Sequence, residues 1–306
     1  MKNLCVAITF HYNPKRLRYL ENITLHLDGL AEQVKLFVIT NTYDHECLSR
    51  IQNSINVKNV KIISSGPLSH PFYLTWHHLE VLRNEYLDNL DVSHFMYLED
   101  DIQVKQNNIS YWLKAREDLR KFGLIPMFVL YEVSSNKLNK RSNGIIRPLL
   151  IKKIPQIMIS DSYGYLNIES PYQAMYLLDR DLAKEHLFDN PLEKREKIWA
   201  IREMAASGLT FVSTPNGFNS RVVVGFNYDT FEIDPDALIH HLPNNYINRL
   251  LSENGKIKIE DSILRKRNLF YFIVNLKIVI LLAIKVIRKV RGGYYVRKEI
   301  NYKFKD

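Results

Sequence analysis

The stretch HFMYLEDDIQV, residues 94–104, joins an apolar run to three consecutive acids. The apolar residues before the acids are typical of a buried β-strand. Glu99, Asp100 and Asp101 follow where that strand ends. Carboxylates packed side by side repel one another and raise each other's pKa unless a cation lies among them. The stretch therefore predicts a buried strand that leads into a cation site.

Strand and helix patterns alternate on the N-terminal side of this stretch. Apolar runs predict strands and 3.6-residue periodicity predicts helices, in the order strand 4–10, helix 16–30, strand 34–41, helix 46–56, strand 60–65 and helix 75–90. This alternation predicts an α/β fold with a mostly parallel sheet and helices on both faces. Such sheets bind ligands beyond the carboxyl ends of their strands. The segment HYNPKR (11–16) and the acid triplet are therefore expected at one edge of the sheet.

The C-terminal side of the stretch shows a more mixed pattern. The predicted elements are a helix at 109–123, strands at 127–133, 144–151 and 156–160, a strand leading into a helix at 172–187 with Asp179 as N-cap, a helix at 193–208 ended by Gly208, and strands at 209–215 and 220–226. No repeat and no Gly/Ser-rich or Pro-rich linker divides the chain. The length of the chain indicates one large domain, or one domain with an appendage.

Composition and charge narrow the class of protein. The chain has 306 residues, of which 46% are hydrophobic and 25% are charged, as in an ordinary globular protein. Two cysteines do not make a disulfide framework, and the N-terminus does not resemble a signal peptide, so the cytoplasm is expected. The net charge of +9 is concentrated near the C-terminus. We therefore expect a catalytic domain at 1–250 and a basic tail at 251–306.

The acid triplet also carries a resemblance to a known family. MYLEDDIQV resembles the DXD-type motif of GT-A-fold glycosyltransferases, and it is most similar to the EDDLEV motif of the N-acetylglucosaminyltransferase I family. The resemblance implies a GT-A fold over roughly the first 240 residues and a nucleotide-sugar donor. It implies that Asp101 binds Mn²⁺ or Mg²⁺, and that Glu99 and Asp100 contact the donor. Oxygen ligands suit both ions.

A second segment resembles a glycosyltransferase element. SPYQAMYLLDRDLA (170–183) is similar to a segment found after the DXD strand in many of these enzymes, which lines the donor-sugar and acceptor side. The sequence departs from that pattern at Ala174, where glycine is usual, and at Asp179, where serine is usual. A core strand that leads into a helix explains most of the same residues.

Sugar transfer with inversion requires a carboxylate that takes the proton of the acceptor hydroxyl. Glu203 is the first choice because it lies on a predicted helix just before a strand, and Glu196 and Asp161 are the alternatives. A solvated surface role explains Glu203 equally simply, and a retaining enzyme needs no such base. The catalytic residues expected are therefore Glu203 and Asp161.

Two further segments offer ligands to the donor or the metal. His240 and His241 precede Pro243, and in several GT-A families a histidine near the C-terminal end of the domain completes the metal shell. Either histidine is expected to serve in that way. Asn13 and Arg16 are expected beside the nucleotide, because arginine suits bidentate contacts to phosphate. An exposed loop or helix face is the alternative for these residues.

The C-terminal segment is both basic and apolar. Residues 269–287 are nearly long enough to span a bilayer, but Lys277 and Lys285 interrupt them, and each costs about 2.5–3.5 kcal/mol near the bilayer centre. The lysines fall on one side of a helix, which predicts that residues 263–297 lie on an anionic membrane surface. Packing on the protein itself or on a partner subunit is the alternative.

These features together predict a metal-dependent glycosyltransferase, peripheral on the inner face of the cell membrane. Its acceptor would be a saccharide or a lipid-linked molecule, as in the synthesis of bacterial surface polysaccharide. A sugar nucleotidylyltransferase shares the sheet and the metal, but the first strand here leads into HYNPKR (11–16) without the glycine-rich loop of that class. A non-catalytic protein that binds membranes or nucleic acid would need only the basic tail. We do not expect nucleic acid as a partner, because an organised acid triplet has no role there.

Overall fold

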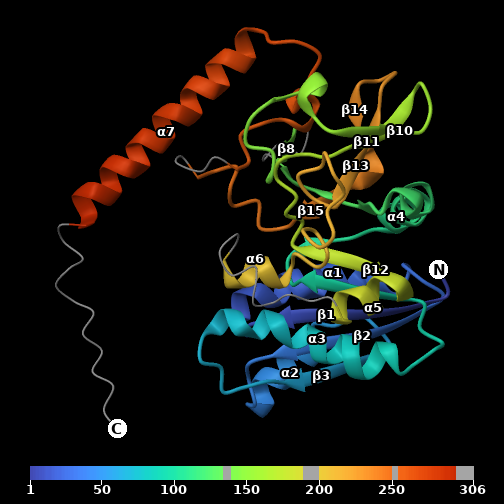
Figure 1. The fold of residues 1–306 in the computed structure, drawn as a ribbon. Coiled ribbons are helices and arrows are strands. Elements are labelled where there is room, and N and C mark those ends of the chain that lie inside the picture. The colour runs from blue at the N-terminus through green and yellow to red at the C-terminus, as the bar shows by residue number, and fades with distance from the viewer. Residues whose placement is uncertain (134–138, 189–199, 250–253, 294–306) are drawn as a thin grey trace.

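The computed structural model describes residues 1–133, 139–188, 200–249 and 254–293. Its lower half is a five-stranded sheet with the order β12-β4-β1-β2-β3 (Figure 1). Its strands are β1 (Asn3–Phe10), β2 (Gln33–Thr40), β3 (Val60–Ser64), β4 (His94–Glu99) and β12 (Met175–Asp179). The first four strands run parallel and β12 runs antiparallel to β4. The predicted α/β architecture with a mostly parallel sheet is confirmed.

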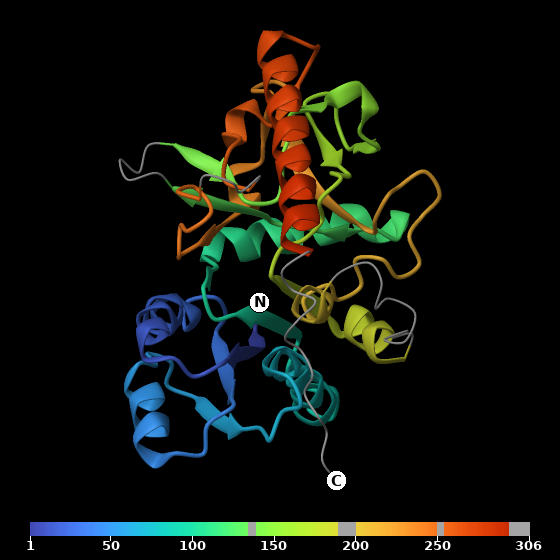
Figure 2. The same ribbon diagram turned by 90° about the vertical axis from the view of Figure 1, so that its left-hand side faces the viewer.

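Helices cover both faces of this sheet, as Figure 2 shows. The helical segments are α1 (Leu17–Leu27), α2 (His45–Asn53), and the continuous stretch formed by η2 (Pro71–His77), α3 (His78–Val81) and η3 (Leu82–Leu87). In α1, Leu20, Ile23 and Leu27 are fully buried. These side chains share one face of the helix because they are three and four residues apart. Their burial attaches α1 to the sheet and places the N-terminus of α1 near the end of β1.

Two further sheets form most of the upper half. The four-stranded sheet has the order β5-β15-β7-β8, with β5 (Ile102–Gln103), β7 (Val129–Val133), β8 (Lys140–Ser142) and β15 (Leu238–His241). The other sheet has the order β10-β11-β13-β14, and its strands are β10 (Gln156–Met158), β11 (Tyr163–Leu166), β13 (Val222–Asn227) and β14 (Glu232–Ile233), with β6 (Ile125–Pro126) pairing with β13. Helix α4 (Gln106–Leu119) leads from the acid triplet into this half.

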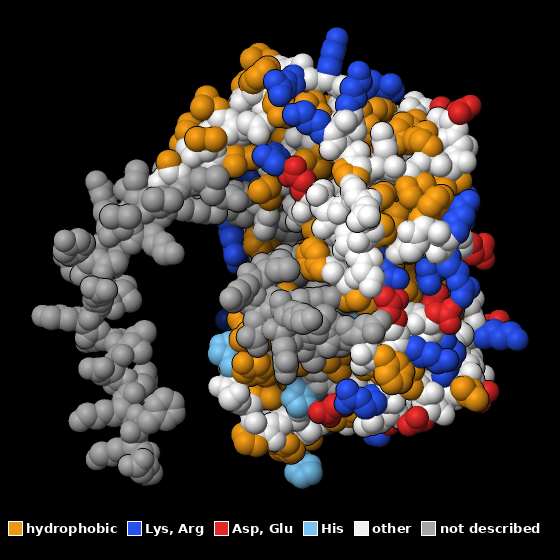
Figure 3. Space-filling model, viewed as in Figure 1, with side chains coloured by type: hydrophobic (Ala, Val, Ile, Leu, Met, Phe, Trp, Pro, Cys, Tyr) orange, Lys and Arg blue, Asp and Glu red, His pale blue; other side chains and the backbone are white. Residues whose placement is uncertain are grey.

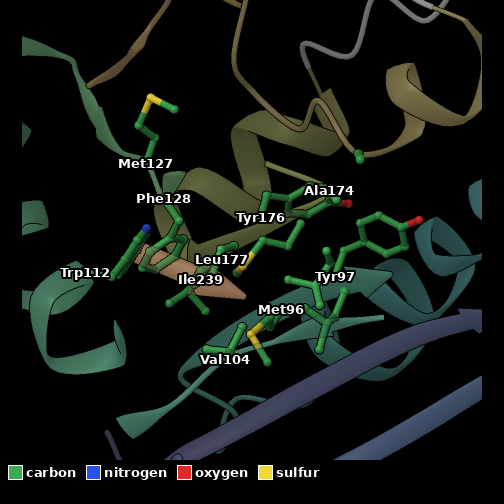
Figure 4. Packing of buried hydrophobic residues seen from close by; sticks show 14 of the residues in the cluster. Met96, Tyr97, Val104, Trp112, Met127, Phe128, Ala174, Tyr176, Leu177 and Ile239 are labelled. Atoms are coloured by element: carbon green, nitrogen blue, oxygen red, sulfur yellow. The ribbon is translucent and has the colours of Figure 1, made fainter. Parts of the chain in front are cut away.

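A continuous core joins the two halves directly beneath the acid triplet. Figure 4 shows Met96 of β4 and Leu177 of β12 near Trp112 of α4, Phe128 and Ile239 of β15. All five side chains are at most 2% exposed. Each fully buried side chain of this size contributes about 1.5–3 kcal/mol. This core fixes the position of the acids relative to both halves.

Two predictions after residue 190 are wrong or only partly confirmed. Residues 209–215, predicted as a strand, form a series of turns whose side chains Leu209 and Val212 are buried. Of the predicted helix 193–208, Ile201–Ala205 is observed as α6, whereas residues 206–208 form turns and residues 193–199 lie outside the described part of the chain. Helix α5 (Arg180–Phe188) begins as predicted, with the Leu182 N–H donating to Asp179.

The body of the protein continues beyond residue 250, the boundary expected from the sequence. β16 (Ile263–Leu264) pairs with β9 (Leu149–Leu150), and Ile257 and Ile263 are buried. Helix α7 (Leu269–Gly293) then extends away from the body (Figure 1). Among the described residues, no helix is both long enough and apolar enough to cross a membrane. The tail is therefore limited to α7 and the residues after it.

Candidate active site at the end of β4

The acid triplet lies at the carboxyl end of the parallel sheet. Glu99 is the last residue of β4, and Asp100 and Asp101 form the turn into β5. Thr9 of β1 lies opposite Glu99, so the segment after β1 starts beside the acids. Glu99, Asp100 and Asp101 are only 9%, 7% and 6% exposed. Three carboxylates this close and this buried require cations nearby.

Arg16 supplies the first of these cations. Asn13 caps the short 3₁₀ helix Pro14–Arg16, because its Oδ1 accepts from the Lys15 N–H at 3.0 Å. This turn directs Arg16 to the acids. Its Nε and Nη2 donate to the two oxygens of Asp100 at 2.7 and 2.5 Å, and Nη2 also donates to Asp101 Oδ2 at 2.8 Å. Burial raises the pKa of Asp100 to about 6, although Arg16 opposes that shift. HYNPKR and the acids thus meet at the predicted edge.

His241 supplies a second positive group, and Glu132 orients it. The Nδ1–H of His241 donates to Glu132 Oε1 at 2.7 Å, so that Nε2 faces Asp101 Oδ2 at 3.7 Å. Glu132 is fully buried, and its Oε2 also accepts from the backbone N–H groups of Tyr246 and Ile247. Burial lowers the pKa of His241, but Asp101 and Glu132 outweigh burial and raise it to about 9. Without an ion, His241 is therefore a charged partner of Asp101, and it would have to release its Nε2 proton to bind a metal.

The pairing of β15 with β5 brings His241 to the acids. His241 lies opposite Ile102, the residue that follows Asp101, and the Leu242 N–H donates to the Asp101 carbonyl at 2.9 Å. His240, the other predicted metal ligand, points to the opposite face because side chains alternate along a strand. Its ring stacks on Tyr131 with the centroids 5.0 Å apart. Of the two predicted metal ligands, the structure therefore directs His241, and not His240, towards Asp101.

Asp101 and His241 fit a divalent ion. Asp101 Oδ1 is buried and has no hydrogen-bond partner in the described structure. Asp101 Oδ2 and His241 Nε2 lie 3.7 Å apart, so these two residues would be the ones to hold a divalent ion. The described residues contain no cluster of three or more His, Cys, Asp or Glu side chains arranged to hold a metal. Mg²⁺-type sites use few protein ligands and complete their shell with water and substrate phosphates.

A cavity of about 260 Å³ opens beside the acids. It is lined by the end of β1 and the segment after it, by η2, by two of the three acids and by α6. The lining residues are Thr9, His11, Asn13, Arg16, Pro71, Phe72, Leu74, Thr75, Glu99, Asp100 and Arg202. Glu99 Oε1 accepts from the Tyr172 hydroxyl at 2.7 Å. Burial raises the pKa of Glu99 to about 7, although the nearby charge of Arg202 lowers it. Polar and charged groups at the mouth of a partly apolar cavity are typical of a substrate site.

The predicted general bases have different positions. Glu203 lies on α6 next to the cavity-lining Arg202, whose Nη2 is 3.3 Å from Glu203 Oε1. Glu203 Oε2 is buried and has no hydrogen-bond partner in the described parts of the chain. Asp161 is exposed in the turn between β10 and β11 and does not line the cavity. Glu196 lies outside the described residues. Neither Glu203 nor Asp161 lines the cavity, but Glu203 lies beside Arg202, which does.

Glu132 and Arg202 belong to the site but were not identified from the sequence. Glu132 is the single acid within the apolar strand 127–133. An acidic residue in a buried strand usually has a buried partner, so the sequence did contain a signal for Glu132. Arg202 had no comparable signal, because an arginine on a short polar helix is usually exposed. The buried Nε of Arg202 has no partner among the described residues. Arg202 is the second arginine that lines the cavity, after Arg16.

Comparisons with known proteins complete this description. No family model and no curated protein matches the chain. The galactosyltransferase LgtC in complex with donor and acceptor sugar analogs is 13% identical over 67% of this chain and 70% of that chain, with a TM-score of 0.36. TarS of S. aureus is 13% identical over 73% of this chain and 35% of that chain, with a TM-score of 0.38.

A synthase is also similar at this level. The 4-diphosphocytidyl-2C-methyl-D-erythritol synthase of Anaerococcus prevotii is 12% identical over 61% of this chain and 75% of that chain, with a TM-score of 0.29. TM-scores this low do not define a function. The function is therefore inferred from the geometry of the site.

Proposed function

We propose that this chain is a metal-dependent glycosyltransferase of GT-A type that uses a nucleotide-sugar donor. One observation carries the proposal. Buried acids at the carboxyl end of a parallel sheet face a cavity, and Glu132 holds His241 towards Asp101, whose second oxygen has no partner in the described structure. A site of this kind suits a divalent ion that is shared with a diphosphate.

Asp101 and His241 would hold Mn²⁺ or Mg²⁺, and the bound ion would supply Lewis-acid stabilisation of the leaving nucleoside diphosphate. The protein's own groups bind and orient the donor. Arg16 donates to phosphate oxygens, because its planar guanidinium matches them in bidentate geometry. Glu99 and Asp100 accept hydrogen bonds from donor hydroxyls. Asn13 holds the turn that presents Arg16.

Glu203 is the proposed general base if the anomeric centre is inverted. Glu203 follows the cavity-lining Arg202 on α6, and its buried Oε2 has no described partner, so a small movement of α6 would let it accept the proton of an acceptor hydroxyl. Asp161 is too exposed and too separate from the cavity to serve in this way. Arg202 pairs with Glu203, and its charge also lowers the pKa of Glu99.

Helix α7 supports a place for the enzyme at a membrane surface. Its exposed apolar side chains are Leu269, Phe272, Ile273, Leu276, Val279 and Ile280, which share one face of the helix. Figure 3 shows hydrophobic side chains along the first part of this helix and Lys and Arg side chains near its start. An apolar face next to cations suits the interface of an anionic bilayer. A saccharide or lipid-linked acceptor at the inner face of the bacterial membrane, used in surface polysaccharide synthesis, fits this placement.

A thermal-shift screen of nucleotide sugars tests the proposal. One donor in Mn²⁺ should stabilise the wild-type chain, by about 2.7 kcal/mol at 100 times its Kd. Asp101→Asn should abolish that stabilisation, whereas Asp229→Asn, at an exposed loop position, should retain it. The proposal is overturned if no nucleotide sugar stabilises the wild type with Mn²⁺, or if Asp101→Asn responds as the wild type does.

A further inference from the structure

Arg16 occupies the acid cluster as an internal cation. Its guanidinium makes three hydrogen bonds, two to Asp100 and one to Asp101. The side chains of Asp100 and Asp101 are 10% and 9% exposed, whereas that of Arg16 is 35% exposed. Arg16 therefore reaches the buried acids from the cavity side and can leave them without unfolding the strand that carries them.

The position of Arg16 conflicts with an ion held by Asp101 and His241. Asp101 Oδ2 accepts from Arg16 Nη2 at 2.8 Å and faces His241 Nε2 at 3.7 Å. Arg16 and a divalent ion held by Asp101 and His241 would therefore use the same carboxylate oxygen. An ion bound through the unpartnered Oδ1 would still share this carboxylate with the guanidinium. Positive groups this close repel one another strongly where water is largely excluded. Arg16 and the ion therefore compete for Asp101.

We propose that Arg16 closes the metal site until the donor binds, and that its release from Asp101 makes the ion and the donor's diphosphate bind together. The proposal rests on the glycosyltransferase function proposed above, and it specifies how that site is regulated. Arg16 lines the cavity, so a diphosphate beside Asp100 offers the guanidinium new anionic partners. The diphosphate thereby removes the cost of displacing Arg16.

This exchange makes the two ligands cooperative. The divalent ion alone binds weakly because it must displace an internal cation that is already hydrogen-bonded. A diphosphate raises the affinity for the ion, and by thermodynamic reciprocity the ion raises the affinity for the diphosphate by the same factor. The site would then stay closed to free divalent ions in the absence of donor.

Titration of Mn²⁺ alone, followed by electron paramagnetic resonance of the free ion, tests the competition without any turnover. Arg16→Met removes the charge and the three hydrogen bonds, and it should tighten Mn²⁺ binding about tenfold or more. Arg18→Met is the matched control, because Arg18 is exposed and donates only to Tyr19 among the described groups. It removes the same charge two residues away and should leave the Kd for Mn²⁺ unchanged. Arg16→Gln, which keeps a donor for Asp100, should show the same tightening if Arg16→Met folds poorly.

The cooperativity is tested with UDP, GDP, CDP and ADP as diphosphate probes. In the wild type, Mn²⁺ and the preferred diphosphate together should raise the unfolding temperature by more than the sum of their separate effects, and this excess should shrink in Arg16→Met. Unchanged or weaker Mn²⁺ binding in folded Arg16→Met and Arg16→Gln would overturn the proposal. Failure of the proposed glycosyltransferase site would give a different result from failure of the Arg16 proposal. In that case Asp101→Asn would leave Mn²⁺ binding intact in both the wild-type and the Arg16→Met backgrounds.

Discussion

Glu132 offers the sharpest test of how the site is held together. We expect Glu132→Gln to lower both the stability of the protein and its affinity for Mn²⁺, although the residue does not line the cavity. The carboxylate accepts from three donors, which are the His241 ring and the backbone N–H groups of Tyr246 and Ile247. Glutamine has the same shape but only one acceptor oxygen. One or two of these donors would lose their partner.

The size of the effect follows from these contacts. Each buried donor left without an acceptor costs about 1–3 kcal/mol. Because Glu132 is fully buried, water cannot replace it. The free energy of unfolding should therefore fall by about 2–5 kcal/mol, a large part of the 5–15 kcal/mol typical of a folded domain. Loss of the group that orients a metal-binding histidine typically weakens metal affinity about 10–100-fold.

Urea unfolding and Mn²⁺ titration measure the two effects of Glu132→Gln. Glu169→Gln is the control, because Glu169 pairs with Arg147 on the surface, where its side chain is 55% exposed. That change should cost at most about 1 kcal/mol and should not alter Mn²⁺ binding. The reasoning is refuted if Glu132→Gln matches the control in both measurements.

Three further predictions concern other parts of the chain. Burial lowers the pKa of His78 to about 3, so on acidification the unfolded state takes up the proton before the folded state does. The free energy of unfolding should therefore fall between pH 6.5 and 3, by up to about 1.4 kcal/mol per pH unit. His78→Gln should reduce this slope, as measured by urea unfolding at pH 7, 6 and 5. Gly208→Ala should destabilise the protein more than Gly123→Ala. Both glycines have a positive φ, but only at Gly208 would an added Cβ meet the Tyr176 ring, at 3.0 Å. Equal unfolding midpoints for the two variants would contradict this prediction. Leu276→Glu should lower sedimentation with vesicles containing anionic lipid, and unchanged sedimentation would exclude this face of α7 as the contact.

The sequence by itself determined the central sheet and the place of the acids in it. Continuous apolar runs such as 34–41 are long enough to identify buried strands, and the helices between them show 3.6-residue periodicity. Parallel pairing then requires that the carboxyl ends of β1 and β4 lie together. For this reason Arg16 and the acids could be placed at one edge before any contact was known.

Only the tertiary structure decided which other side chains complete the site. His240 and His241 are neighbours with the same chemistry, and the register of β15 against β5 directs one to Asp101 and the other to Tyr131. Glu132 meets His241 from a strand more than a hundred residues earlier. The buried turns at 209–215 show the same limit, since an apolar run specifies burial but not backbone conformation. Periodicity depends on residues near in sequence, whereas strand register depends on long-range pairing, so only the folded chain could bring these side chains together.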